Sequence, residues 1–241
     1  MSSKFVLIDA GHNELIAGKR SPDGSLLEYE FNYDVANKIK KHLERHGIKA
    51  EVMQIRTSSA TEDVNQRVSK ANKLKPDILV SIHANAAGVS GWYIGTDGLS
   101  WNTANGWEVF CYEPHKASGE SYKLAKAIET ESIQLLGLRN RGIKDGKSLG
   151  MVARTTMPAV LIEHAFYTNE KECRLLQSQA FREKCALADA KGIVNYFGLE
   201  WIGSDYSKAV QERFGFEEQT MRYLENYKYS NDLLRKLATM K

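Results

Sequence analysis

Short apolar runs alternate with amphipathic segments along the first 200 residues of the 241-residue chain, and this alternation constrains the fold more than any other feature. Short runs of consecutive apolar residues fit strands that are covered on both faces. The segments between them place apolar residues at helical spacing. Strands that alternate with helices are typical of an α/β domain. We therefore predict a mostly parallel, twisted sheet flanked by helices, followed by a small C-terminal helical appendage.

The pattern also gives approximate bounds for each element. Strands are predicted at residues 5–8, 50–55, 77–82, 107–112 and 159–162. Helices are predicted at residues 32–44, 62–74, 121–136 and 181–197. The stretch from 84 to 106 is rich in Gly, Ala, Ser, Asn and Trp, which favours loops that cover a site over elements of the core.

Charge and cysteine content exclude several classes of protein. The chain has 33 basic and 30 acidic residues, a balance that argues against nucleic-acid binding. Its three cysteines, Cys111, Cys173 and Cys185, are odd in number and form no C-x-x-C motif, so they are interpreted as free thiols in the core. No apolar run is long enough for membrane insertion, and no signal peptide precedes the first strand, so we expect a protein that stays in the cytoplasm as synthesised until it is released.

Polar side chains follow three of the predicted strands. His12 follows the first strand, His83 the third and Glu163 the last. The carboxyl ends of parallel strands share one edge of a sheet, so these groups are expected to lie together, and Gly11 is expected to let the backbone turn sharply there. A catalytic zinc site takes three protein ligands from His and carboxylate and leaves a position for water. The third ligand is then a carboxylate at the start of the first helix, either Glu28 or Glu30.

Four motifs together resemble a known family. They are His12 in LIDAGH, Glu28 in EYEFNYDVA, His83 in SIHAN and Glu163 in LIEHAFYTN. They are similar to the zinc-dependent N-acetylmuramoyl-L-alanine amidases of bacterial autolysins and phage endolysins, over about residues 4–198. In the family pattern the metal-binding glutamate stands four residues before the asparagine that opens the helix, which selects Glu28 over Glu30.

The resemblance implies a site and a reaction. His12, Glu28 and His83 would bind Zn²⁺, and Glu163 would be the catalytic carboxylate. The substrate would be the peptidoglycan of the bacterial cell wall, and the bond would be the amide between N-acetylmuramic acid and the L-alanine of the stem peptide. The chain departs from the pattern at Asn13, where glycine is usual, and at His164, where a small residue is common.

Further residues are candidates for substrate binding, each with a structural alternative. Asn85 lies two residues after His83 and is expected on the same side of the strand, unless it only forms a turn. Arg56 and Arg141 are candidates for binding a substrate carboxylate, although surface or structural salt bridges are their commoner role. Trp101 is predicted to line the groove together with Trp92 and Trp107, the alternative being a role in the core or in packing of a lid. The remaining histidines of the chain are interpreted as surface residues: His42, His46 and His115.

The chain is predicted to divide into a catalytic domain, residues 1–200, and a short helical segment, residues 204–241. In the latter, Phe216, Thr220, Tyr223, Leu224 and Tyr227 fall at helical spacing, and Leu233, Leu234 and Leu237 mark a second apolar face. Such short helices have to pack on each other, on the catalytic domain or on another chain, and a wall-binding or self-association module is one interpretation. A phage endolysin is the favoured setting. The alternatives are a bacterial autolysin of the same activity or a zinc peptidase that acts on stem peptides.

Overall fold

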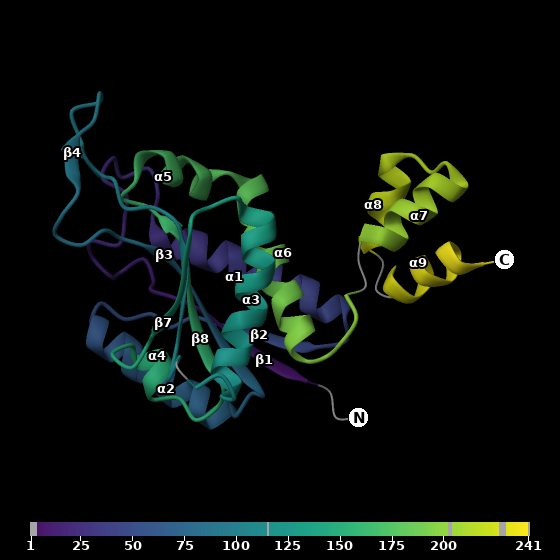
Figure 1. Ribbon diagram of the computed structural model, residues 1–241, viewed down its shortest axis with the longest axis horizontal. Coiled ribbons are helices and arrows are strands. Elements are labelled where there is room, and N and C mark those ends of the chain that lie inside the picture. Colours follow the sequence, from purple (N-terminus) through teal and green to yellow (C-terminus); the bar gives the residue numbers. More distant parts are fainter. Residues whose placement is uncertain (1–3, 115, 202–203, 227–229, 241) are drawn as a thin grey trace.

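A six-stranded sheet forms the centre of the fold within the part of the chain that the structure describes (Figure 1). The computed structural model describes residues 4–114, 116–201, 204–226 and 230–240. The strands of the sheet are β1 (Phe5–Ala10), β2 (Lys49–Met53), β3 (Ile78–Asn85), β6 (Trp107–Cys111), β7 (Asn140–Asp145) and β8 (Ala159–Phe166). Their order is β2-β1-β3-β8-β6-β7. Only the β6–β8 pair is antiparallel, so the predicted mostly parallel sheet is confirmed.

Helices cover both faces of this sheet. The helices α1 (Glu28–Arg45), α3 (Glu120–Leu136) and α6 (Gln179–Tyr196) pack on one face and share the main apolar core with alternate residues of the strands. The helices α2 (Ala60–Leu74) and α4 (Gly150–Ala153) lie on the other face, over a smaller cluster that contains Leu7 and Leu79. Successive strand residues point to opposite faces, which explains why Val6 and Ile8 belong to the first core while Leu7 belongs to the second.

Each predicted strand and helix of residues 1–200 is present, but some bounds differ. Helix α1 begins at Glu28, four residues before the predicted start. The prediction was late because the N-cap residue is Leu27, and no Ser, Thr, Asp or Asn marks the N-terminus of this helix. The second strand ends at Met53, and Arg56 therefore lies in the loop that follows it. The sequence pattern did not reveal β7, which is an edge strand with a single large apolar residue, Ile143.

Other elements were also missed because they are short. The strands β4 (Trp92–Ile94) and β5 (Ser100–Asn102) form a hairpin inside the region predicted as loops. Helix α5 (Glu170–Gln177) follows β8 directly and starts at Asn169, whose side chain accepts hydrogen bonds from the backbone N–H groups of Lys171 and Glu172. The expectation for the cysteines is confirmed, since Cys111, Cys173 and Cys185 are buried and free.

Three C-terminal helices stand apart from the sheet in Figure 1: α7 (Ser204–Phe214), α8 (Glu218–Asn226) and α9 (Ser230–Thr239). They pack on each other around Val210, Met221 and Leu234. Before them, Trp201 packs against the main core, and its ring lies 4.2 Å from that of His46 at the end of α1. None of the helices within the described residues has the length and apolar character that crossing a membrane requires.

Candidate active site

His12, Glu28 and His83 meet at one edge of the sheet. His12 lies in the loop after β1, Glu28 is the first residue of α1 and His83 lies near the end of β3. One ligand atom from each lies within 4.8 Å of the other two. Glu28 approaches His83 Nδ1 at 3.0 Å and His12 Nε2 at 3.5 Å. The structure thus brings together the three side chains that the sequence predicts as metal ligands.

The backbone that carries His12 adopts an unusual conformation. His12 itself has a φ of 61°, in the left-handed region, which costs a non-glycine residue about 1–2 kcal/mol. Gly11 is not among the residues with positive φ, so the expectation that Gly11 makes the turn was wrong. Glycine is required there for space: a methyl group at Gly11 would lie 2.2 Å from Cε1 of His83. The imidazole rings of His12 and His83 lie edge to face, with centroids 4.9 Å apart.

Glu28, and not Glu30, belongs to this cluster. Glu28 is 2% exposed, and its Oε1 accepts hydrogen bonds from Asn32 Nδ2 and from the backbone N–H of Ala84, each at 3.4 Å. Asn32 also donates to the carbonyl of Gly11 at 2.9 Å, which ties the first turn of α1 to the loop that carries His12. Glu30 lies on the exposed side of the same turn.

The chemistry of these three groups fits a divalent metal. Burial, with the nearby His83, lowers the pKa of His12 to about 4, so its ring is neutral near pH 7, as a metal ligand must be. Burial would raise the pKa of the Glu28 carboxyl, but the hydrogen bond and charge of His83, with His12 and Lys19, hold that pKa below its ordinary value. Burial opposes protonation of His83, yet its contact with Glu28 raises its pKa. A cation of the zinc type would bind the deprotonated forms of these three groups.

Glu163 lies beside this cluster. It is the register partner of His83 across the β3–β8 pair, and neighbours in register project from the same face of a sheet. Its Oε2 is shielded from solvent and has no hydrogen-bond partner among the described residues. Burial, with the negative charges of Glu28 and Glu108, raises the pKa of Glu163 to about 8, against the opposing effect of His83. A carboxyl group with a pKa near neutrality is suited to accept and return a proton.

A cavity of about 230 Å³ opens next to these groups. His12, His83 and Glu163 line it, and Lys19 contributes a cationic side chain from the loop between β1 and α1. Its apolar wall consists of Val64 from α2 together with residues of α4 and β8: Leu149, Gly150, Met151 and Leu161. Sequence reasoning missed Lys19, because a lysine in a polar loop gives no signal of its position.

Asn85 and Arg141 both contact Glu108, which was also missed. Glu108 Oε1 accepts a hydrogen bond from Asn85 Nδ2 at 2.7 Å, and its Oε2 pairs with Arg141 Nε at 2.8 Å. Glu108 is the register partner of Glu163 across the β6–β8 pair, so His83, Glu163 and Glu108 form a row over three neighbouring strands. The signal that could have revealed Glu108 is a lone acidic residue inside an apolar strand. Asn85 lies on the side of the strand predicted for it.

The other predicted substrate-binding residues have structural partners. Arg56 is exposed and pairs with Glu14 at 2.6 Å, the surface salt bridge of the alternative interpretation. Trp101 is 2% exposed and belongs to the main core, and its Nε1–H donates to Asp97 at 2.9 Å, which favours the core alternative over a groove-lining role. Trp107 is buried as well, whereas Trp92 in β4 is 42% exposed.

The other histidines within the described residues do not line the cavity. His164 is fully buried and points to the opposite face of the sheet, where its Nε2 lies 2.8 Å from Asp189 of α6. Its neighbour Glu163 faces the cavity, so alternation along β8 explains the difference. His42 contacts Glu183 at 2.8 Å, and both His42 and His46 are only partly exposed because Trp201 packs beside them. His115 lies outside the described residues.

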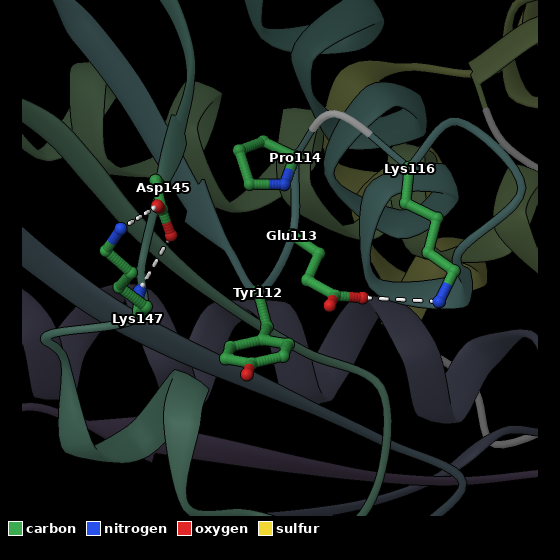
Figure 2. A pocket seen from close by; sticks show the side chains of 6 residues that line it. All are labelled: Tyr112, Glu113, Pro114, Lys116, Asp145 and Lys147. Atoms are coloured by element: carbon green, nitrogen blue, oxygen red, sulfur yellow. Dashed lines mark hydrogen bonds and ion pairs between the residues drawn. The ribbon is translucent and has the colours of Figure 1, made fainter.

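A second hollow, of about 490 Å³, lies where β6 and β7 end (Figure 2). Tyr112 and Pro114 line it together with two ion pairs, Lys116 with Glu113 at 3.4 Å and Lys147 with Asp145 at 3.3 Å. The charged groups in Figure 2 are therefore engaged with each other, and none of the chemistry of the first cavity recurs here.

The fold and the site define a class: an α/β domain with a cluster of His, Glu and His and a further buried carboxyl group, that of Glu163, at one sheet edge. Residues 6–195 match the family described as N-acetylmuramoyl-L-alanine amidase. The chain therefore belongs to this family, and the resemblance stated from the sequence is confirmed.

Individual relatives agree with this assignment. The chain is 30% identical over 192 residues to the N-acetylmuramoyl-L-alanine amidase LytC of Bacillus subtilis, covering 80% of this chain and 35% of LytC. The chain thus spans about a third of the length of that relative. It is 29% identical over 201 residues to the endolysin of Bacillus phage SPP1, covering 82% and 68% of the two chains. The structure of the catalytic domain of CwlV, an amidase from Bacillus (Paenibacillus) polymyxa var. colistinus, superposes with a TM-score of 0.66 at 31% identity, covering 82% of this chain and 99% of that one.

Proposed function

We propose that this protein hydrolyses the amide bond between N-acetylmuramic acid and the L-alanine of the stem peptide in peptidoglycan. The observation that carries the proposal is the cluster of His12, Glu28 and His83 with Glu163 in register beside it. This arrangement occurs in a chain of the N-acetylmuramoyl-L-alanine amidase family, and the matched region contains all four residues.

The proposed cofactor is one Zn²⁺ ion, held by His12, Glu28 and His83. Two imidazoles and one carboxylate are the donor set of a catalytic zinc site with a position open for water. When bound, zinc supplies an acidified water and polarises the scissile carbonyl. Its other effect would be to neutralise the charge of Glu28, which now contributes to the raised pKa of Glu163.

Glu163 is the proposed catalytic residue. Glu163 lines the same cavity as His12 and His83, and its shielded Oε2 has no competing partner among the described residues. It would accept the proton of the attacking water and then transfer it to the leaving nitrogen of L-alanine, which cannot depart as an anion. His164 is not a substitute for this role, because its ring contacts Asp189 behind the sheet.

The proposed substrate contacts surround this centre. Lys19 places a positive charge in the cavity, where it would bind an anionic group of the substrate. Asn85 and Arg141 stay proposed contacts on the other side of Glu163, where Glu108 holds both. Arg56 and Trp101 are weaker candidates for substrate contacts, since each already has a partner in the structure.

Residues 1–200 are proposed as the catalytic domain and residues 204–241 as a separate wall-targeting module. The helices α7, α8 and α9 share an apolar cluster of their own, which supports a unit that folds beside the catalytic domain. The matches to a bacterial amidase at 30% identity and to a phage endolysin at 29% support the autolysin and the endolysin settings equally. In both settings the protein would act on the cell wall after release.

The decisive test is product analysis on purified peptidoglycan digested by the zinc-loaded protein. Amidase activity releases intact stem peptides with a free L-alanine amino group and leaves muramic acid with a free lactyl carboxylate. A zinc peptidase would instead release free amino-acid ends within the stem peptide and leave the muramoyl–alanine bond uncut. The Glu163→Gln protein serves as the matched control for contaminating hydrolases. If the wild type cleaved within the stem peptide and the Glu163→Gln control did not, the protein would be a peptidase and the amidase proposal would be wrong.

A further inference from the structure

The loop that carries His12 is held by a buried arginine from α2. Arg67 is 2% exposed and lies on the face of α2 that meets the loop after β1. Its Nη1 donates to the carbonyl of Ala10 at 2.7 Å, and its Nη2 donates to the carbonyl of His12 at 2.7 Å. One planar guanidinium therefore holds the carbonyl groups on both sides of Gly11.

Two buried aspartates fix the guanidinium in turn. Arg67 Nη1 donates to Asp9 Oδ1 at 2.6 Å, and Arg67 Nε donates to Asp63 Oδ2 at 2.9 Å. Asp9 also accepts a hydrogen bond from Ser81 of β3 at 2.6 Å. Because the donors of a guanidinium lie in a fixed plane, these contacts determine the direction in which Arg67 meets the loop.

Asn13 closes the arrangement from the loop itself. It is 3% exposed, and its Nδ2 donates to Asp63 Oδ1 at 3.2 Å and to the carbonyl of Thr57 at 3.0 Å. Its Oδ1 accepts the backbone N–H of Leu15 at 2.9 Å. Asn13, the residue next to His12, is thus bound to the same carboxylate that orients Arg67, that of Asp63.

These contacts lie on either side of a residue in a disfavoured conformation. His12 has a φ of 61°. Arg67 binds its own carbonyl and that of Ala10, two residues before it, and the side-chain amide of Asn13, the residue after it, donates to Asp63. A histidine left free would relax to a negative φ and turn its ring away from His83. We propose that Arg67 and Asn13 are positioning residues, which hold the His12 backbone in the conformation that directs its imidazole toward Glu28 and His83.

The inference rests on the metal site of the proposed function, but not on the identity of the substrate. If His12 is held in place by these residues, loss of one of them weakens metal binding in a protein that is still folded. A merely structural role would instead lower the stability of the fold and leave the zinc affinity of the folded protein unchanged.

The experiment measures the zinc dissociation constant of the full chain by competition with a chromophoric chelator, at a temperature where circular dichroism shows every metal-free protein folded. Asn13→Ala is expected to weaken zinc binding by about 10-fold, and Arg67→Lys by about 10- to 100-fold, the range known for residues that orient metal ligands. The control is Arg154→Lys, because Arg154 is an exposed arginine whose Nη1 donates to Asn65 of α2 at 2.8 Å and not to the loop that carries His12.

The outcomes separate this inference from the proposed function. If folded Asn13→Ala binds zinc with the wild-type dissociation constant, the positioning role is refuted, even if its melting temperature falls. If Arg67→Lys does not fold, Asn13→Ala decides the matter alone. Failure of the wild-type chain to take up zinc would instead contradict the metal site in the proposed function.

Discussion

The sheet domain and the C-terminal helices bury their side chains in different ways. Behind the active site, the main core joins residues of β1, β3, β6 and β8 to three long helices, and Arg67 and Asp9 are buried in an ion pair with further hydrogen bonds. The C-terminal helices enclose only a small apolar cluster around Val210, Met221 and Leu234. Tyr223 remains 75% exposed there.

This difference separates two tasks. A metal site and a proton-transfer group require side chains held within fractions of an ångström, which takes a large core and satisfied buried polar groups. Binding to a surface of the size of a cell wall requires only a folded, exposed face. The comparison predicts that chemistry depends on the first region alone, and that the second affects only action on intact walls.

The largest effect is expected from loss of a metal ligand. His12→Ala, Glu28→Ala and His83→Ala should each reduce both zinc content and hydrolysis to background, because two remaining ligands are too few to hold the ion. Zinc is measured by elemental analysis after gel filtration, and hydrolysis by amine release from peptidoglycan. Glu30→Ala is the control and should match the wild type. If Glu30→Ala contained no zinc while Glu28→Ala still bound it, the ligand would be Glu30 and not Glu28.

The next effect concerns proton transfer. Glu163→Gln keeps the shape of the side chain but removes its proton-accepting oxygen, so turnover should fall at least about 100-fold while zinc content and fold are retained. Turnover on a soluble muropeptide and zinc content are measured on the same preparation. Near wild-type turnover in this variant would remove Glu163 from the mechanism.

A smaller, substrate-dependent effect is expected from the C-terminal helices. A chain that ends at residue 203 should keep its zinc and its turnover on soluble muropeptides, but should lyse whole cells about 10-fold less well, because a second binding module raises the effective concentration at the wall. Leu234→Ala, which removes a buried side chain of the cluster, tests the same point in the full-length chain. Loss of zinc or precipitation of the shortened chain would show that these helices belong to the catalytic core.

The smallest effect is a pH dependence of stability. The pKa of Glu163 rises from its ordinary 4.5 to about 8 in the folded protein, so the folded state binds more protons between these values. Its contribution to stability is fully present below pH 4.5 and is lost as the pH rises through 8. The metal-free wild type should therefore lose a few degrees of melting temperature, relative to metal-free Glu163→Gln, between about pH 5 and pH 8.

The opposite shift at His12 does not disturb this comparison. The pKa of His12 is lowered to about 4, so its contribution is present above the ordinary histidine pKa and is lost as the pH falls toward 4. The wild type and Glu163→Gln both carry His12, so its contribution cancels in the difference between their melting temperatures. The shortened chain should show the same difference, and a flat difference across this pH range would contradict the raised pKa of Glu163.

Prediction from the sequence worked where a residue's position follows from its own strand or helix. The apolar runs before His12, His83 and Glu163 are long enough to indicate strands, and parallel strands bring such ends together. The pattern failed where it is short or polar, as in β7, and where a residue acts through distant partners. Glu108 is such a case, since its two partners come from β3 and β7.

Two positions show this boundary clearly. At Gly11 the sequence indicates that glycine is needed, but only the structure shows that the imidazole of His83 occupies the space of a side chain, while His12 makes the turn. At His164 the residue type suggests chemistry, and its place on β8 puts it on the far side of the sheet, against Asp189.

The sequence by itself determined the α/β class, the order of the main elements and the place of His12, His83 and Glu163 at one sheet edge, because strand direction and side-chain alternation are local properties of the chain. The resemblance to the family added Glu28 to this set. The tertiary structure decided which groups hold that set in place. Arg67 meets Ala10 and His12 from 57 and 55 residues away, and Glu163 acquires its pKa from Glu28 and Glu108 on other elements. Such contacts depend on how helices and strands pack, and no local pattern records them.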